Sequence, residues 1–238
     1  MMNVKAFIFA RGGSKGLPNK NILQISGKPL LAHSILMAQS IPHVSDVFVS
    51  TDSSQIADIA IDYDAKVIRR PLELASDTSP EWLSWQHAIK YVAQTDTNFD
   101  CFLSLPTTSP LRNQKDVLEC LSAFQPGVDV VMSMTAARRS PWFNMVSMDR
   151  SQKITLLSGP NLSSISRRQD TPECFDLTTV AYVARPDFIM ANTTFWDGVV
   201  VGVKIPPERA LDIDSYYDYR VAKLIMEDSL QNGSGTDS

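Results

Sequence analysis

The densest chemistry in the sequence lies in a short stretch, residues 10–21, which reads A-R-G-G-S-K-G-L-P-N-K-N and is called the glycine loop below. Glycines that follow a strand let backbone N–H groups approach a phosphate, because no Cβ stands in the way. Arg11, Lys15 and Lys20 place three positive charges within ten residues, a density that suits a triphosphate. The pattern therefore predicts a nucleotide-binding loop in preference to a solvated basic turn.

Two common phosphate-binding loops do not fit these residues. A dinucleotide-binding G-x-G-x-x-G needs a glycine two positions after Gly12, where Ser14 stands. It also needs an acidic residue about 20 positions further on, whereas Asp52 lies roughly 36 beyond Gly16. A Walker P-loop needs four residues between its first glycine and G-K-[ST], and the loop does not supply them.

Two carboxylates near the end of the chain form a second chemical pattern. Asp212 and Asp214 flank Ile213, and residues two apart in a strand point to the same face. Both carboxylates would then meet one site, with Ile213 packed behind them. Two carboxylates and phosphate oxygens make a natural Mg²⁺ site, because Mg²⁺ prefers oxygen ligands and keeps several waters. A pair of surface acids before a helix is the simpler alternative.

Alternating strands and helices must position both patterns. The apolar run 4–10 is typical of a strand buried on both faces, and the helix at 53–63 has Ser53 or Asp52 as its N-cap. Strands that alternate with helices indicate an α/β fold with a mostly parallel sheet covered on both faces. The expected strands are 4–10, 46–50, 67–69, 101–105, 128–134, 177–183 and 199–205, and the expected helices are 29–41, 53–63, 80–92, 116–124 and 216–226.

One long segment breaks this alternation. Residues 136–173 are polar, rich in Ser, Arg and Pro, and too long for an ordinary loop. We therefore expect them to leave the main domain as a dimerisation arm or a substrate lid. The tail, residues 231–238, has the composition of a disordered segment, so the expected domain spans residues 1–230.

Composition limits the possible functions. The length of 238 residues suits one large domain. A net charge of −4 argues against general binding to nucleic acid or to an anionic membrane. The apolar runs are far too short to span a membrane, and three scattered cysteines fit neither a disulfide framework nor a zinc site. A cytoplasmic protein is the expectation.

The glycine loop resembles the signature loop of the acylneuraminate cytidylyltransferases, also called CMP-sialic acid synthetases. A following G-K-P-L-L strengthens the resemblance, as does R-P-L-E-L-A-S-D-T at residues 70–78. The family implies a three-layer, Rossmann-like nucleotidyltransferase fold that forms a homodimer. It also implies transfer of CMP from CTP to the anomeric hydroxyl of a nonulosonic acid, with Mg²⁺ as cofactor and pyrophosphate as product.

The same resemblance assigns roles residue by residue. It gives Arg11, Lys20 and the two aspartates the catalytic role, and it places the segment 167–172 in the acid-sugar pocket across a dimer interface. It implies nucleotide contacts from Arg11, Gly13, Ser14, Lys15, Lys20, Asn21 and Arg70; sugar contacts from Arg168, Gln169, Tyr182, Phe195 and Trp196; and metal binding by Asp212 and Asp214.

Two departures from the family pattern leave the sugar open. Pro106 stands where relatives carry a glutamine that touches the sugar, and Thr178 stands where they carry an asparagine. The nucleotide interpretation is unaffected by either change. We therefore keep legionaminic acid and deaminated sialic acid as alternative substrates. A non-catalytic nucleotide-binding homologue is an alternative of a different class.

Overall fold

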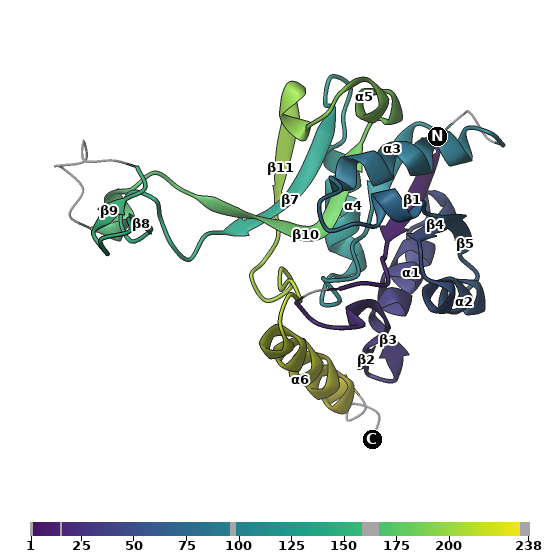
Figure 1. Cartoon of the computed structure of the whole chain (residues 1–238), viewed down its shortest axis with the longest axis horizontal. Coiled ribbons are helices and arrows are strands. Elements are labelled where there is room, and N and C mark those ends of the chain that lie inside the picture. Colours follow the sequence, from purple (N-terminus) through teal and green to yellow (C-terminus); the bar gives the residue numbers. More distant parts are fainter. Residues whose placement is uncertain (1, 15, 96–98, 159–166, 234–238) are drawn as a thin grey trace.

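A seven-stranded sheet forms the centre of the computed structural model, which describes residues 2–14, 16–95, 99–158 and 167–233 (Figure 1). Across the sheet the strands follow the order β11 (Val200–Lys204), β7 (Val130–Ala136), β10 (Phe175–Ala184), β6 (Cys101–Ser104), β1 (Val4–Phe9), β4 (Val44–Thr51) and β5 (Lys66–Arg69). Within this sheet β10 runs antiparallel to both of its neighbours, and every other pairing is parallel. The expected mostly parallel α/β fold is confirmed.

Helices cover both faces of the sheet and make three layers. On one face α1, α2 and α4 share a buried cluster with the sheet, and on the other face α3 and α5 do so. The helices are α1 (Leu30–Ser40), α2 (Ser54–Asp62), α3 (Glu81–Val92), α4 (Gln114–Ala123), α5 (Pro186–Ala191) and α6 (Tyr216–Gly233).

Alternation along β1 shows why the sequence folds into these layers. Ala6 and Ile8 point into the cluster with α1, whereas Phe7 points into the cluster with α3. All three side chains are fully buried, as expected for a strand covered on both faces. The second cluster is rich in aromatic rings, and Phe7 stacks on Phe102 with 4.5 Å between ring centroids.

Local signals fixed several helix ends. Ser53 caps α2 by accepting a hydrogen bond from the backbone of Ile56, which confirms one of the two predicted caps. Asn113 and Asp116 form a capping box at the start of α4. The sequence did not predict the short helix α5 or the two-stranded hairpin of β2 (Gln24–Ile25) and β3 (Lys28–Pro29).

A long ribbon leaves the sheet from the ends of β7 and β10, and residues 137–174 are called the arm below. Figure 1 shows it reaching away from the main body to a small hairpin of β8 (Val146–Met148) and β9 (Ile154–Leu156). The arm exposes large apolar side chains, namely Phe143, Met145, Val146, Met148, Ile154 and Leu157. Of the helices in the described ranges, none has the length and hydropathy to span a membrane.

Candidate active site

A cavity of about 600 Å³ opens at the edge of the sheet where β1, β5 and β6 end. Open α/β sheets bind ligands outside the carboxyl ends of their strands, and this cavity lies at that position. Four parts of the chain line it: the glycine loop, the segment from Arg70 to Ser84, the turn at residues 106–108, and the pair Asp212 and Asp214. Thr179 and Tyr182 from β10 complete its wall.

The glycine loop is held by polar contacts to its surroundings. The backbone N–H of Gly12 donates to Asp52 Oδ1 at 3.0 Å, so the carboxylate of Asp52 orders the loop while its neighbour caps α2. Asn21 is buried; its Nδ2 donates to Arg11 O at 2.9 Å, and its Oδ1 accepts from Thr107 Oγ1 at 2.6 Å. Asn21 therefore lines the cavity mainly as a brace between the loop and the turn after β6.

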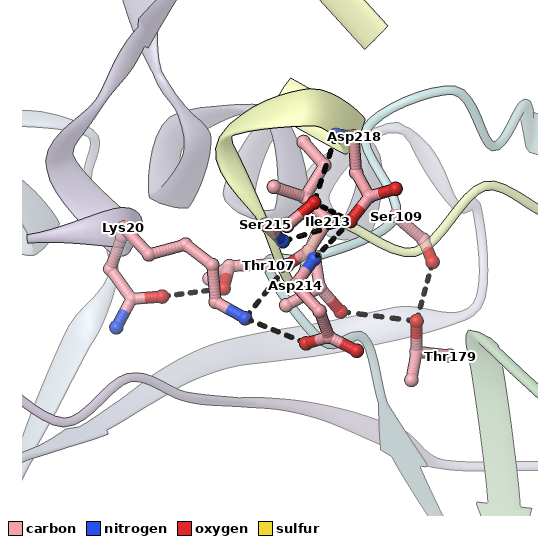
Figure 2. Close-up of polar contacts among 10 residues, drawn as sticks. Lys20, Thr107, Ser109, Thr179, Ile213, Asp214, Ser215 and Asp218 are labelled. Atoms are coloured by element: carbon pink, nitrogen blue, oxygen red, sulfur yellow. Dashed lines mark hydrogen bonds and ion pairs between the residues drawn. The ribbon is translucent and has the colours of Figure 1, made fainter. Parts of the chain in front are cut away.

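Lys20 joins the glycine loop to residues 212–214, which are called the aspartate segment below. Its Nζ donates to Ile213 O at 2.7 Å and lies 3.2 Å from Asp214 Oδ1 (Figure 2). Gly16 lies against the same segment, because a Cβ built there would be 2.6 Å from Asp214 O. The loop and the segment, 193 residues apart for Lys20 and Ile213, thus form one wall of the cavity.

The aspartate segment is extended but is not the strand that the sequence suggested. It is tied to the turn after β6 by one backbone hydrogen bond, from Ile213 N to Thr108 O at 2.9 Å. Ile213 is fully buried in a small cluster with Leu17 and Leu30, so it packs behind as expected. Asp212 and Asp214 both line the cavity. The two carboxylates therefore meet one site, as predicted, although the segment is not a strand.

The two carboxylates differ in environment. Asp214 is exposed. Burial raises the pKa of Asp212, and the nearby charge of Asp214 adds to that shift. Hydrogen bonds from the hydroxyls of Thr108 and Thr179 oppose it. Asp212 Oδ1 is buried and has no hydrogen-bond partner among the described residues. An orphaned carboxylate oxygen beside an exposed carboxylate suits Mg²⁺. Groups of three or more His, Cys, Asp or Glu that could hold a metal are absent from the described ranges.

Two arginines line the cavity in different ways. Arg70 is buried, donates from Nε and Nη2 to Ser50, and lies over the ring of Phe9 at 5.5 Å. Burial lowers the pKa of Arg70, and the charge of Glu81 opposes that shift. Arg11 is half-buried and forms an ion pair with Asp77 at 2.7 Å. Both guanidinium groups are thus in place to meet an anionic or hydrogen-bonding ligand.

The other predicted nucleotide residues are placed less centrally. Ser14 lines the cavity, whereas Gly13 is exposed in the same loop. Lys15 lies outside the described residues. The sequence prediction gave no site role to several residues that line the cavity, among them Glu81, Thr107 and Thr179. Glu81 in particular has the sequence signal of an ordinary acid in the first turn of a helix.

The side chains predicted to bind the sugar do not all line the cavity. Tyr182 lines the cavity, and Phe195 stacks behind it at 6.1 Å between ring centroids. Trp196 is 66% exposed and does not line the cavity. Gln169 lines a second hollow of about 470 Å³ at the base of the arm, and the side chain of Arg168 lies outside what the structure describes.

The two residues that depart from the family pattern, Thr178 and Pro106, differ in where their side chains lie. Thr178 is buried and donates to Ser133 Oγ at 2.9 Å, so its hydroxyl serves the sheet and not the cavity. Thr179 lines the cavity and lies 2.6 Å from Ser109 Oγ. Pro106 lines the cavity with an apolar ring, and its carbonyl accepts from Ser34 at 3.1 Å.

The chain is similar to several known proteins. The sequence profile of the family described as "Cytidylyltransferase" matches residues 6–83. The chain is 32% identical to the post-translational flagellin modification protein B of Campylobacter coli, over 97% of this chain and 98% of that protein. It is 30% identical to the CMP-N,N'-diacetyllegionaminic acid synthase of Campylobacter jejuni, over the full length of both.

A third relative and one solved structure extend the comparison. The N-acylneuraminate cytidylyltransferase of Escherichia coli is 29% identical over 93% of this chain, which spans 52% of that protein. The structure of CMP:2-keto-3-deoxy-manno-octonic acid synthetase with CTP shares the fold, with a TM-score of 0.72 at 16% identity. That likeness covers 95% of this chain and 99% of the other.

Proposed function

Because this chain belongs to the cytidylyltransferase family, we propose that it transfers CMP from CTP to the anomeric hydroxyl of a nonulosonic acid and releases pyrophosphate. One observation carries the proposal most directly. Lys20 and the aspartate segment, distant in sequence, meet at one wall of a cavity that Arg11 and Arg70 also line. Cations and paired carboxylates at one site suit a triphosphate and its metal.

The chain's own residues supply positioning and charge. Backbone N–H groups of the glycine loop, with Arg11, Ser14 and Lys20, hold the triphosphate, and Gly13 and Lys15 join them. The anomeric hydroxyl attacks the α-phosphate in line, and the cations neutralise the charge that develops on the phosphate oxygens. Asn21 acts mainly by holding the loop in shape.

Asp212 and Asp214 are the proposed holders of Mg²⁺. The orphaned Oδ1 of Asp212 and the exposed carboxylate of Asp214 are the two protein ligands that support this assignment. When bound, the metal neutralises phosphate charge as a Lewis acid. The contact of Lys20 with Asp214 keeps the second carboxylate beside the glycine loop, where the phosphates are held.

We propose that the acid sugar binds beside Tyr182, with Phe195 behind it. Full-length similarity to a CMP-N,N'-diacetyllegionaminic acid synthase makes legionaminic acid the first acid to test, followed by sialic and deaminated sialic acid. Arg168 would hold the sugar carboxylate by two parallel hydrogen bonds, with Gln169 and Trp196 completing the pocket. Pro106 lines the cavity with an apolar ring, so a sugar bound there would lack the polar contact that the family resemblance implies at this position.

A homodimer is part of the proposal. The exposed apolar side chains of the arm form a surface that a second copy would cover, and that copy would bring residues 167–172 to its partner's cavity. Replacing both Met148 and Ile154 by Asp should yield a monomer in light scattering. A double variant that remains a dimer would contradict the role of the arm.

A cytoplasmic location also remains a proposal. Cys101, Cys120 and Cys174 are all free, which suits a reducing compartment. Burial raises the pKa of the Cys120 thiol to about 12, so this thiol is unreactive at neutral pH. Fractionation of the native host with an antibody against the chain would test the location.

The decisive experiment is pyrophosphate release from CTP and Mg²⁺ with separate additions of legionaminic, sialic, deaminated sialic and pseudaminic acids. Release with one acid supports the chemistry and identifies the sugar. Asp214→Asn should reduce turnover sharply, whereas Asp58→Asn, an exposed acid on α2, should not. Tight CTP binding with no release for any acid would favour the non-catalytic homologue, and a wild-type rate for Asp214→Asn would overturn the metal assignment.

A further inference from the structure

Strand β10 carries a large bulge directly beside the cavity. Its register against β7 shifts between Leu177 and Tyr182, so that residues 178–181 of β10 together face the single residue Ser133 of β7. β-Bulges re-aim side chains and are over-represented next to active sites. None of residues 178–181 has a part in the phosphate, metal or sugar binding proposed above, so the bulge has a role still to be explained.

Ser133 fixes the shape of this bulge. Its buried Oγ donates to Thr178 O at 3.0 Å and accepts from the backbone N–H of Ala181 at 3.1 Å. One hydroxyl of β7 thus binds backbone groups on both sides of Thr179. The side chain of Thr179, which lies between these two anchors, lines the cavity.

Thr179 meets two other hydroxyls at the cavity wall. Its Oγ1 accepts from Thr108 Oγ1 at 3.0 Å and lies 2.6 Å from Ser109 Oγ (Figure 2). Ser109 is fully buried, and within the described ranges its hydroxyl has no partner other than Thr179. If Ser109 accepted this bond, its own proton would be buried without an acceptor, which is unfavourable. Ser109 is therefore the donor.

Counting protons then gives the direction of the remaining bond. A hydroxyl has two lone pairs and one proton, and Thr179 uses both lone pairs to accept from Thr108 and Ser109. The carboxylate of Asp212 accepts hydrogen bonds from the hydroxyls of Thr108 and Thr179. Because Thr108 also donates its single proton to Thr179, the full donor to Asp212 is Thr179.

We propose that Thr179, presented by the bulge, is a positioning residue that donates to Asp212 and sets the direction in which this carboxylate meets the metal. The inference rests on the proposed function, because it concerns how one of the two proposed metal ligands is held. Partners that orient a metal ligand typically contribute about ten- to a hundred-fold to metal affinity or activity. Thr179 acts through Asp212, so loss of its hydroxyl should matter only when the metal is present.

The test is calorimetric binding of CTP without any acid sugar, so that the nucleotide is not consumed. Each titration is made with EDTA and again with Mn²⁺, which accepts the same oxygen ligands as Mg²⁺ and reports its own binding by electron paramagnetic resonance. Thr179→Val keeps the branched Cβ that suits a strand and removes the hydroxyl. We expect its CTP affinity with EDTA to equal that of wild type, and the gain in affinity that Mn²⁺ gives to fall about tenfold or more.

Two further variants separate orientation of the carboxylate from folding of the strand. Thr179→Ser restores a hydroxyl and should recover most of the gain that Mn²⁺ gives. Thr135→Val is the matched control, since it makes the same change in the neighbouring strand β7. Its hydroxyl has no hydrogen-bond partner in the part of the chain that the structure describes, and it does not line the cavity. This variant should behave as wild type with EDTA and with Mn²⁺.

The outcomes distinguish the inference from the function beneath it. A folded Thr179→Val variant that keeps the wild-type gain from Mn²⁺ overturns the inference and leaves the proposed function standing. An equal loss of CTP affinity with EDTA and with Mn²⁺ also overturns it, because a structural role would weaken both. Wild-type protein that binds CTP with no gain from Mn²⁺ overturns the metal assignment and the inference together. Wild-type protein that binds no CTP overturns the proposed function itself. Circular dichroism of each variant establishes that the fold is intact.

Discussion

Gly16 gives the sharpest test of how tightly the glycine loop and the aspartate segment must fit. In Gly16→Ala, the added Cβ would lie 2.6 Å from Asp214 O, and ordinary contact begins at 3.4 Å. The two groups must therefore separate by about 0.8 Å. Asp214 O is a backbone atom, so no side-chain rotation relieves the overlap.

The cost of that separation follows from the contacts it disturbs. If the hydrogen bond from Lys20 Nζ to Ile213 O takes the whole shift, its length grows from 2.7 Å to about 3.5 Å, beyond the usual range. Displacement of about 1 Å between positioned groups can cost about a hundred-fold in rate. We expect kcat/KM for CTP in Gly16→Ala to fall about a hundred-fold, or about 2.7 kcal/mol, and the free energy of unfolding to fall by about 1–3 kcal/mol.

Two measurements check this expectation. Pyrophosphate release at varied CTP gives kcat/KM, and urea unfolding gives the free energy of unfolding. Gly13→Ala is the control for unfolding, because a Cβ at Gly13 meets nothing within 4 Å and should change stability by less than about 0.5 kcal/mol. If Gly16→Ala had wild-type kcat/KM and stability, the loop would yield freely and the reasoning from close packing would be wrong.

Three further predictions concern stability and the sugar site. Burial raises the pKa of Asp46, but hydrogen bonds from two lysine side chains outweigh it and lower the value to about 2, from an ordinary 3.8. The stabilising effect of the Asp46 carboxylate is present above its unfolded-state pKa and is lost as the pH falls through about 2. The difference in unfolding free energy between wild type and Asp46→Asn should therefore shrink by about 1–2 kcal/mol between pH 5 and pH 2, as measured by urea unfolding. Gly198→Ala should destabilise by about 1–3 kcal/mol because its Cβ would lie 2.4 Å from the ring of Phe188, whereas Gly202→Ala meets a flexible methionine and should cost less; equal costs in urea unfolding would contradict this. Trp196→Ala, at a 66% exposed position, should leave the melting temperature nearly unchanged and raise KM for the acid severalfold at constant KM for CTP; an unchanged KM for the acid would remove Trp196 from the sugar site.

The sheet and its helices could be predicted because their signals are local. The nearly continuous apolar run of β1, the Ser53 cap and the proline before α3 each act within a few residues. The antiparallel direction of β10 had no such signal, because it depends on the path of the arm between β7 and β10. The six residues of α5 are too few to show a helical period.

The site residues that could be predicted are those in charged sequence motifs. The residues that were missed lie outside such motifs. Arg11, Lys20, Arg70 and the aspartates belong to recognisable patterns, and all of them line the cavity. The aspartate segment was expected to be a strand, but strand pairing needs a neighbour that sequence periodicity cannot reveal, and here the segment has one backbone bond to the turn after β6. Glu81 was missed because only the folded chain brings it beside Arg70.

The bond between Lys20 and Ile213 has a consequence for the protein during its synthesis. The glycine loop leaves the ribosome early, but its partner residue is made 193 positions later. Closing so long a stretch of chain is slow and entropically unfavourable compared with forming local contacts. A nascent chain that stops short of residue 213 therefore has the sheet's first strands without an assembled phosphate site. Nucleotide binding by ribosome-bound chains of increasing length would appear only after the aspartate segment has emerged.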